Sequence, residues 1–330
     1  MKPRRRVRPL FAVAFMAAVA SLSAESIWEE LPALPEGLAG QVVAATGDSV
    51  LVAGGTLWDD DRKVWRDAVL TLGPDDQSWR KVGSIPQPLG YAGFVGGDDG
   101  IWLLGGHNEE GALSDIVHVD QEGTCQVIAS MPEAWRFSRG ARSERGDYFV
   151  VRREQVDAGW EGAFLAVDVG SGQIRECAPL PNAAWVLPAV AATGGNIVVA
   201  GGATRVEAMG GIRNQSGILT FDPQQKVWHH RGDLPVALRG MGAVALGVGR
   251  VYLAGGYGDA KGFEDRAWIF DVKTGDLTEA PALPLAMMPE LLRVGDAVYA
   301  IGGEDAPRRR SARVFRALIS SLLKERENFN

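Results

Sequence analysis

Cysteine and histidine, the side chains that most often hold transition metals, are scarce in this chain. Its 330 residues include only Cys125, Cys177 and four histidines, and their spacing matches no known kind of metal site. The glycine-rich stretch at residues 93–97 does not lead into a helical pattern, so it is not a phosphate-binding loop. The sequence therefore predicts no metal and no cofactor.

Long apolar runs are missing as well. The first 24 residues combine five basic residues, an apolar run of eleven residues from Leu10 to Ala20, and small residues at Ser21–Ala24. The run is too short to span a bilayer, and this order of segments is typical of a secretory signal peptide. We predict a signal peptide at residues 1–24 and a periplasmic or secreted protein with no membrane segment after cleavage. The alternative is a disordered basic tail.

The chain has no excess of positive charge. Its net charge is −7, and removing a leader with five basic and no acidic residues takes it to −12. An acidic body repels phosphate backbones and anionic lipid surfaces. Nucleic acid is therefore not an expected partner, and an anionic ligand would have to be held by local arginines.

Glycine, by contrast, is abundant and recurs in doublets. A double glycine closes an apolar run five times, at Gly54-Gly55, Gly105-Gly106, Gly201-Gly202, Gly255-Gly256 and Gly302-Gly303. Six times a proline follows seven residues after a residue expected to plug one sheet, in the pairs Trp28/Pro35, Trp79/Pro86, Cys125/Pro132, Ile174/Pro181, Trp228/Pro235 and Leu277/Pro284. A period near 50 residues indicates a repeat array. The third repeat lacks the doublet, because Tyr148–Val151 runs directly into Arg152.

Residues 232–284 show what each repeat is expected to contain. Apolar segments alternate with turn residues and predict four antiparallel strands, at Met241–Leu246, Arg250–Ala254, Ala267–Val272 and near Leu277. Four-stranded units repeated radially form a propeller, and the double glycines would allow a close backbone approach near its axis. The pattern resembles the Kelch repeat over residues 26–316. The expected fold class is all-β, a six-bladed Kelch β-propeller.

The ring is expected to close through the amino end of the mature chain. The last repeat stops after Phe315 without its plug–proline strand, and the one unpaired strand of that kind is residues 27–35. An amino-terminal strand that completes the last blade would remove both sheet edges. The predicted domain is therefore residues 25–317, followed by a short tail at 318–330 in which Leu318–Leu323 is expected to be helical.

The two cysteines fall in predicted outer strands of neighbouring repeats. Cys125 stands where other repeats carry tryptophan, which suits a buried thiol. A disulfide between Cys125 and Cys177 is the alternative in an exported protein.

A ligand site is expected at the mouth of the ring, where the loops after the double glycines meet the loops leading into each first strand. The loops leading in contribute Leu38, Gly90-Tyr91, Arg136–Arg139, Trp185, Arg239 and Glu290. Glu304 follows the last double glycine and precedes a basic cluster, Arg308–Arg310. A carboxylate beside a cation can accept a proton, and an arginine can hold a substrate carboxylate at two points. Arg239 is a further candidate for substrate binding.

A resemblance to the N-acetylneuraminate epimerases, which are sialic acid mutarotases, adds a function. It rests on Gly-Glu followed by an arginine and a hydrophobic strand at 303–315, and on Gly37–Gly40, Val52–Gly55, Lys63–Asp67 and Pro88–Tyr91. The glutamate repeat comes last and its neighbour first, as in a cyclically permuted branch of that family. The resemblance implies that Glu304 is the acid/base and Arg310 its partner, with Lys63 and Tyr91 lining the pocket. Which of Arg308, Arg309 and Arg310 faces the pocket stays open.

The implied activity is the exchange of sugar anomers by acid/base-assisted ring opening, on N-acetylneuraminate or a related acidic sugar. The alternative is a non-catalytic Kelch propeller that binds a glycan or a protein at its mouth, because propellers host many functions. A copper radical oxidase is disfavoured, since it needs a tyrosine–cysteine pair and axial histidines, whereas both cysteines lie in outer strands.

Overall fold

The computed structural model describes residues 26–97, 99–155, 159–206, 211–247 and 249–324. The signal peptide predicted at residues 1–24 lies outside the described residues. Within them the chain is built almost entirely of antiparallel strands, as predicted, with one short helix, α1 (Ile319–Leu322). That helix confirms the expected helical start of the tail, and its Ile319 and Leu322 are buried. None of the described helices is long and apolar enough to cross a membrane.

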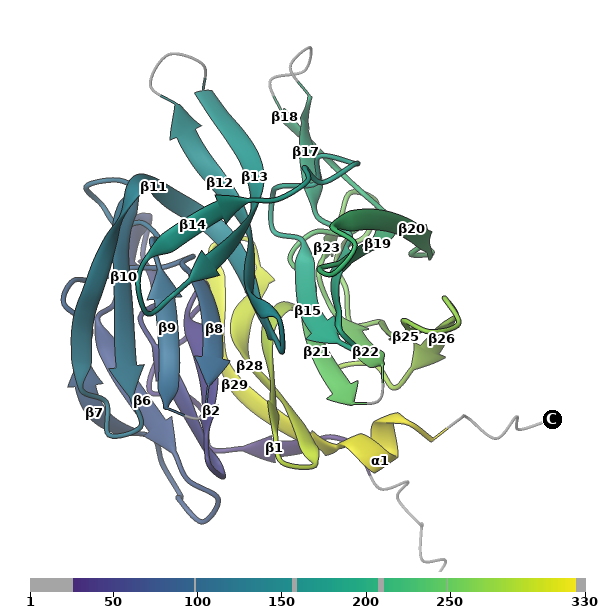
Figure 1. The fold of residues 1–330 in the computed structure, drawn as a ribbon. Coiled ribbons are helices and arrows are strands. Elements are labelled where there is room, and N and C mark those ends of the chain that lie inside the picture. Colours follow the sequence, from purple (N-terminus) through teal and green to yellow (C-terminus); the bar gives the residue numbers. More distant parts are fainter. Residues whose placement is uncertain (1–25, 98, 156–158, 207–210, 248, 325–330) are drawn as a thin grey trace, which may run out of the picture.

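Six four-stranded blades make up the ring (Figure 1). Blade 1 contains β2 (Val42–Thr46), β3 (Ser49–Ala53), β6 (Ala68–Leu72) and β7 (Arg80–Ser84). Blade 4 contains β15 (Ala189–Thr193), β16 (Asn196–Ala200), β19 (Gly217–Asp222) and β20 (Val227–Asp233). Blade 5 contains β21 (Gly242–Gly247), β22 (Arg250–Ala254), β25 (Ala267–Asp271) and β26 (Leu277–Ala280), which agrees with the strands predicted for that repeat.

Blades 2 and 3 share one long strand, β11 (Cys125–Ser143), which the sequence did not indicate. Its first part ends blade 2, after β8 (Gly93–Gly97), β9 (Gly100–Leu104) and β10 (Leu113–Asp120). Its second part begins blade 3, before β12 (Gly146–Gln155), β13 (Gly159–Asp168) and β14 (Gln173–Glu176). The register shifts between Arg136 and Arg139, and Phe137 there has a φ of +54°. This bulge turns the strand from one blade to the next without ending it.

The amino-terminal strand closes the ring, as predicted. Blade 6 runs β27 (Met288–Val294), β28 (Ala297–Ala306), β29 (Arg309–Leu318) and then β1 (Glu29–Leu31). Strand β1 pairs antiparallel with β29, with Glu30 opposite Phe315. The innermost strands β2, β8, β11, β15, β21 and β27 contact one another in turn, and β27 contacts β2.

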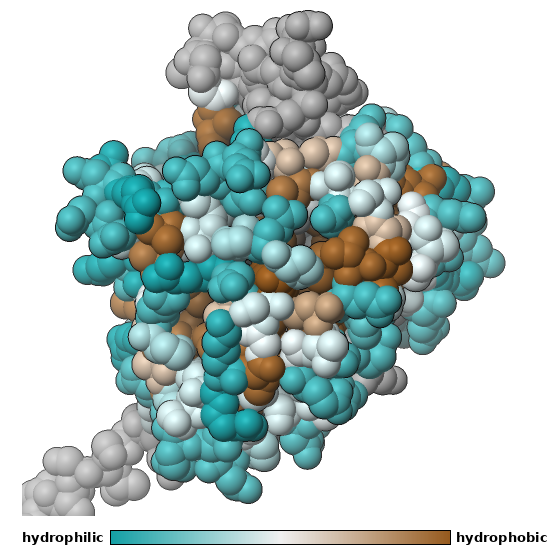
Figure 2. All heavy atoms as spheres, turned by 90° about the vertical axis from the view of Figure 1, so that its left-hand side faces the viewer, coloured by the Kyte–Doolittle hydropathy of each residue, from teal (hydrophilic) through white to brown (hydrophobic). Residues whose placement is uncertain are grey.

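The hydrophobic core lies between neighbouring blades. Six clusters of buried side chains among the described residues each combine strands of two adjacent blades. The predicted plug residue Trp28 is buried, and its indole N–H donates to the carbonyl of Ala282 at 2.8 Å. Trp79 and Trp228 donate in the same way to Pro32 and Ala178. Figure 2 shows the side on which β7 and β10 lie as mainly hydrophilic, with hydrophobic side chains in separate groups.

The double glycines do more than admit close strands at the axis. Both members of each doublet have a positive φ, which glycine adopts without steric cost. The second glycine donates its N–H to the loop leading into the next blade, as from Gly55 to Leu89 and from Gly303 to Leu38. A Cβ on Gly302 would lie 2.9 Å from the carbonyl oxygen of Leu38. The doublets therefore join consecutive blades at the mouth.

Three loops that the sequence left as variable contain small hairpins. They are β4 (Thr56–Asp59) with β5 (Arg62–Trp65), β17 (Ala203–Val206) with β18 (Gly211–Asn214), and β23 (Tyr257–Gly258) with β24 (Gly262–Phe263). In the third blade, where no double glycine interrupts the chain, β12 and β13 pair continuously up to Gln155 and Gly159. This hairpin and β17–β18 project on the side of the ring opposite to α1 (Figure 1).

Candidate functional site

The mouth of the ring is built from two sets of residues that pair within each blade. The residue after each double glycine bridges to the loop leading into the same blade, as Thr56 does with Ala39 and His107 with Gly90. Glu304 occupies this position in blade 6 and pairs with Met288. The backbone of Glu304 is therefore fixed by the sheet on one side and by Arg310 on β29 on the other.

Glu304 and Arg310 form the ion pair expected at this position. Arg310 Nη1 lies 2.7 Å from Glu304 Oε2, and the two side chains are 5% and 21% exposed, respectively. Arg309 pairs instead with Asp305, and Arg308 with Asp61; both of these arginine side chains are more than half exposed. Of the three arginines, Arg310 is therefore the one that is buried beside the glutamate.

Tyr91 and Lys63 lie next to this pair. Arg310 Nη2 donates to the Tyr91 hydroxyl at 3.3 Å, although 219 positions separate the two residues in the chain. The Lys63 ammonium lies 4.4 Å from the centre of the Tyr91 ring, within cation–π range. Ring closure therefore brings together residues from blades 1, 2 and 6, four of the five side chains that the sequence put forward.

Two glycines of the 37–40 motif make room for this cluster. A Cβ on Gly37 would lie 2.2 Å from the carbonyl oxygen of Arg310, and one on Gly40 would lie 2.8 Å from the Tyr91 ring. Gly40 has a φ of +67°, and Tyr91, in the corresponding place of blade 2, has a φ of +58°. Phe137 and Leu187 have φ values of +54° and +47° in the corresponding places of blades 3 and 4, so this backbone conformation belongs to the repeat.

Two aromatic side chains that the sequence did not single out complete the wall. His107 stacks on Tyr91 with ring centres 5.4 Å apart, and Phe137 contacts both rings at 4.9 Å. His107 follows a double glycine and Phe137 sits on the β11 bulge. The repeat position of His107 was the available signal, since it corresponds to that of Glu304.

Arg239 does not join this cluster. Its guanidinium donates to Asn214 Oδ1 at 2.9 Å, lies 3.8 Å from Asp259 and stacks 4.5 Å from the centre of the Tyr257 ring. These partners belong to the loops of blades 4 and 5. The proposed substrate-binding role of Arg239 stays a prediction, and no described contact links it to Glu304.

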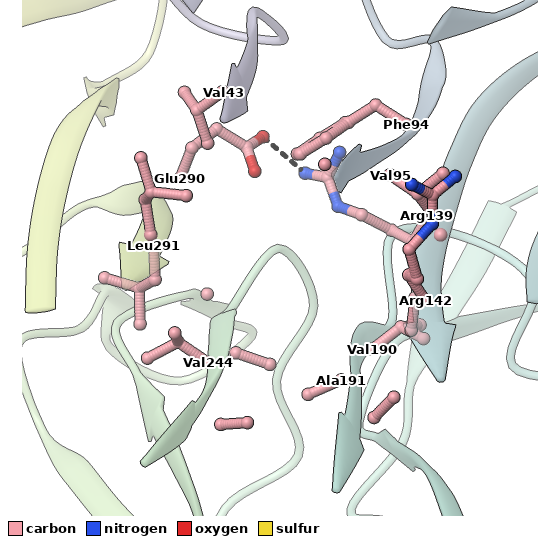
Figure 3. A pocket seen from close by; sticks show the side chains of 18 of the residues that line it. Val43, Phe94, Val95, Arg139, Arg142, Val190, Ala191, Val244, Glu290 and Leu291 are labelled. Atoms are coloured by element: carbon pink, nitrogen blue, oxygen red, sulfur yellow. Dashed lines mark ion pairs between the residues drawn. The ribbon is translucent and has the colours of Figure 1, made fainter. Parts of the chain in front are cut away.

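An axial cavity, which the sequence did not predict, opens along the centre of the ring. It has a volume of about 240 Å³ and is lined by the innermost strands of all six blades. Arg139 of blade 3 and Glu290 of blade 6 meet across it at 2.9 Å, with small apolar side chains such as Val190 and Val244 around them (Figure 3). The two side chains are only 14% and 11% exposed. Burial raises the pKa of Glu290, and the Arg139 charge offsets this only in part.

This pair predicts a pH dependence of stability. Below the ordinary glutamate range, both folded and unfolded chains carry the proton on Glu290 and the full stability is present. As the pH rises through the higher folded-state pKa, the folded protein must bury a charge and stability is lost. Urea unfolding between pH 4 and pH 8 should show that Glu290→Gln gains stability relative to the parent as the pH rises. Parallel pH profiles for the two proteins would contradict this account.

The described residues contain no group of three or more histidine, cysteine or acidic side chains placed to hold a metal. The two thiols are not bonded to each other; Cys125 is partly buried and Cys177 buried. Burial raises the pKa of Cys125 to about 11 and also raises that of Cys177, which favours the protonated thiol at neutral pH.

Comparisons with known proteins give two kinds of relative. Kelch-like protein 36 of Rattus norvegicus is 24% identical over 265 residues, which cover 79% of this chain and 43% of that protein. N-acetylneuraminate epimerases of Yersinia enterocolitica and Yersinia pestis are 30% and 33% identical over 106 residues, 28% of this chain and 26% of each relative. The chain thus matches less than half the length of these relatives. No protein-family model matches it.

The fold and these relatives support a Kelch-type β-propeller. The mutarotase branch and its cyclic permutation stay predictions.

Proposed function

We propose that this protein is an exported sugar mutarotase that interconverts the anomers of N-acetylneuraminate or a related acidic keto sugar. The observation that carries the proposal is the buried contact chain from Glu304 through Arg310 to Tyr91, which joins blade 6 to blade 2. The partial similarity to N-acetylneuraminate epimerases supports the choice of substrate. Export rests on the sequence of residues 1–24, and the intact mass of the exported chain, lacking these residues, would test it.

The chemistry requires one proton acceptor and one donor. The Glu304 carboxylate takes the proton of the anomeric hydroxyl while the bond between the anomeric carbon and the ring oxygen breaks. The ring oxygen takes a proton from the Tyr91 hydroxyl or from water, which gives the open-chain keto acid. Rotation of the carbonyl group and the reverse proton transfers close the ring with the opposite configuration. No group is consumed, so the cycle balances.

Two cations are placed to hold the substrate carboxylate. The Nε and Nη1 of Arg310 are buried and donate no hydrogen bond within the described residues, so the guanidinium carries N–H groups for which the protein supplies no hydrogen-bond acceptor. Lys63 forms no ion pair within the described part of the chain, and its ammonium lies beside Tyr91. A carboxylate bound here would place the neighbouring anomeric carbon close to Glu304.

Arg310→Ala tests the carboxylate grip. We expect the parent protein to show a KM for N-acetylneuraminate at least about tenfold below that for its methyl ester, because the ester lacks the charge. The variant should lose this difference, whereas Arg309→Ala, which removes a surface arginine, should keep it. Proton NMR of anomer exchange supplies both constants. A preference for the acid that survives in Arg310→Ala would count against the grip.

A binding protein without catalysis is the second candidate, because the longer similarity is to a Kelch-like protein. Saturable sugar or protein binding at the mouth without any acceleration of anomer exchange would favour it.

A further inference from the structure

A second cavity lies on the outer side of the candidate site, between the β4–β5 hairpin and the turn at residues 108–111. It has a volume of about 330 Å³ and is lined by Arg62, Lys63, Val64, Trp65, Pro88, Asn108, Glu109 and Glu110. Lys63 belongs to both sites, since its ammonium lies 4.4 Å from the Tyr91 ring and 5.7 Å from the Trp65 ring. The cavity is thus adjacent to the place where a substrate carboxylate would bind.

The turn that carries the acidic side chains is well ordered by its own hydrogen bonds. The Asn108 N–H donates to Gly111 O at 3.0 Å, and Asn108 Oδ1 accepts from the Glu110 N–H at 2.9 Å. Asn108 Nδ2 donates to Gln87 Oε1 at 3.3 Å, which ties the turn to the loop before Pro88. The turn therefore presents Glu109 and Glu110 from a fixed backbone.

The lining of this cavity combines hydrogen-bond acceptors with an indole. Within the described residues, the carboxylates of Glu109 and Glu110 form no ion pair, so their oxygens are available to accept hydrogen bonds from hydroxyl groups. The Trp65 Nε1 is buried without a hydrogen-bond partner in the same part of the chain, so the indole offers a ligand its ring and not its N–H. Carboxylates beside an aromatic ring suit a neutral polyhydroxyl chain, because its hydroxyl groups can donate to them, and Arg62 and Lys63 in the same lining can donate to its hydroxyl oxygens.

We propose that this cavity is a subsite for the polyhydroxyl tail of the substrate, a role that rests on the proposed function. The substrate carboxylate then lies toward Arg310 and Lys63, and the uncharged tail extends into the cavity toward Glu109 and Glu110. The enzyme would accordingly prefer long-chain keto acid sugars to shortened ones.

The test compares two sugars and two double variants. The sugars are N-acetylneuraminate and its seven-carbon analogue, made from the methyl glycoside by periodate cleavage of the tail and borohydride reduction, followed by acid hydrolysis of the glycoside. The double variant Glu109→Gln with Glu110→Gln should raise the KM and the Kd for N-acetylneuraminate, the parent sugar, about tenfold. It should leave the KM and the Kd for the analogue unchanged, and it should not change the kcat. Asp75→Asn with Glu144→Gln removes two exposed charges from strand-connecting turns at the opposite face of the ring and should change nothing.

The outcomes separate this proposal from the proposed function. Equal changes in Kd for both sugars, or no change in Kd for the parent sugar, in the Glu109→Gln, Glu110→Gln double variant would overturn the subsite proposal. If the parent protein binds the sugar without accelerating exchange, calorimetric Kd values alone decide the subsite and the mutarotase proposal fails. If it binds neither sugar, both proposals fail.

Discussion

Glu304→Gln is expected to lower the protein-catalysed rate of anomer exchange by about 10²–10⁴-fold, the usual contribution of a placed acid or base. Glutamine keeps the size of the side chain and an oxygen near Arg310 but has no carboxylate to take the proton. The melting temperature should change little, because the side chain is partly exposed and its shape is retained. Exchange between the N-acetylneuraminate anomers, followed by proton NMR at equal protein concentrations, gives the rate.

Asp305→Asn is the matched control for this change. Asp305 is the next residue in the same strand, β28, but it pairs with the exposed Arg309. Its variant should retain the parent rate. If Glu304→Gln retains the parent rate as well, Glu304 is not the acid/base and the mechanism is wrong.

A chain that begins at Glu36 is expected to lose a large part of its stability. It lacks β1, and with it the burial of Trp28 and Leu34 and the pairing of Glu29–Leu31 with β29. Burying each of these two side chains is worth about 2 kcal/mol, so the loss should reach about 4 kcal/mol or more. The net free energy of unfolding of a typical domain is only about 5–15 kcal/mol. Urea unfolding of chains beginning at residues 26 and 36 measures the difference.

Adding the missing strand as a peptide separates ring closure from a general effect of truncation. A peptide of residues 26–35 should bind the shortened chain and raise its melting temperature. The same peptide with Trp28→Ala should do so much less, because the indole fills the core between blades 5 and 6 and donates to Ala282. A shortened chain that unfolds like the longer one would show that β1 does not hold the ring closed.

The repeat pattern predicted the ring well because every blade packs its strands against its neighbours in the same way and needs similar residues at the same positions. A plug residue, which is tryptophan in three repeats, and a proline seven residues later mark the outer strands. Double glycines mark the ends of five second strands, so most blade boundaries can be recognised in the sequence. The strand shared by blades 2 and 3 is the exception. The sequence gave no sign that one continuous strand, β11, would belong to both blade 2 and blade 3. Pro132 and the missing double glycine do not indicate it, because a bulge at Phe137 leaves no distinct residue pattern.

The part of the candidate site that could be predicted is the pair formed within one hairpin, which also carries the motif of the family that the sequence resembles. Glu304 and Arg310 lie six positions apart, and the hairpin between β28 and β29 is enough to pair them. The Arg139–Glu290 pair was not predicted, because it joins opposite blades and no local spacing encodes a contact across the axis. The sequence also gave no sign that Asn214 and Tyr257 from neighbouring loops contact Arg239, whose substrate-binding role stays a prediction.

A crystal structure with bound N-acetylneuraminate tests the central claim most directly, because that claim is geometric. The account predicts the anomeric hydroxyl within about 2.6–3.2 Å of a Glu304 carboxylate oxygen and the sugar carboxylate on Arg310. A sugar bound in the axial cavity against Arg139, or one that leaves Glu304 without contact, would contradict it.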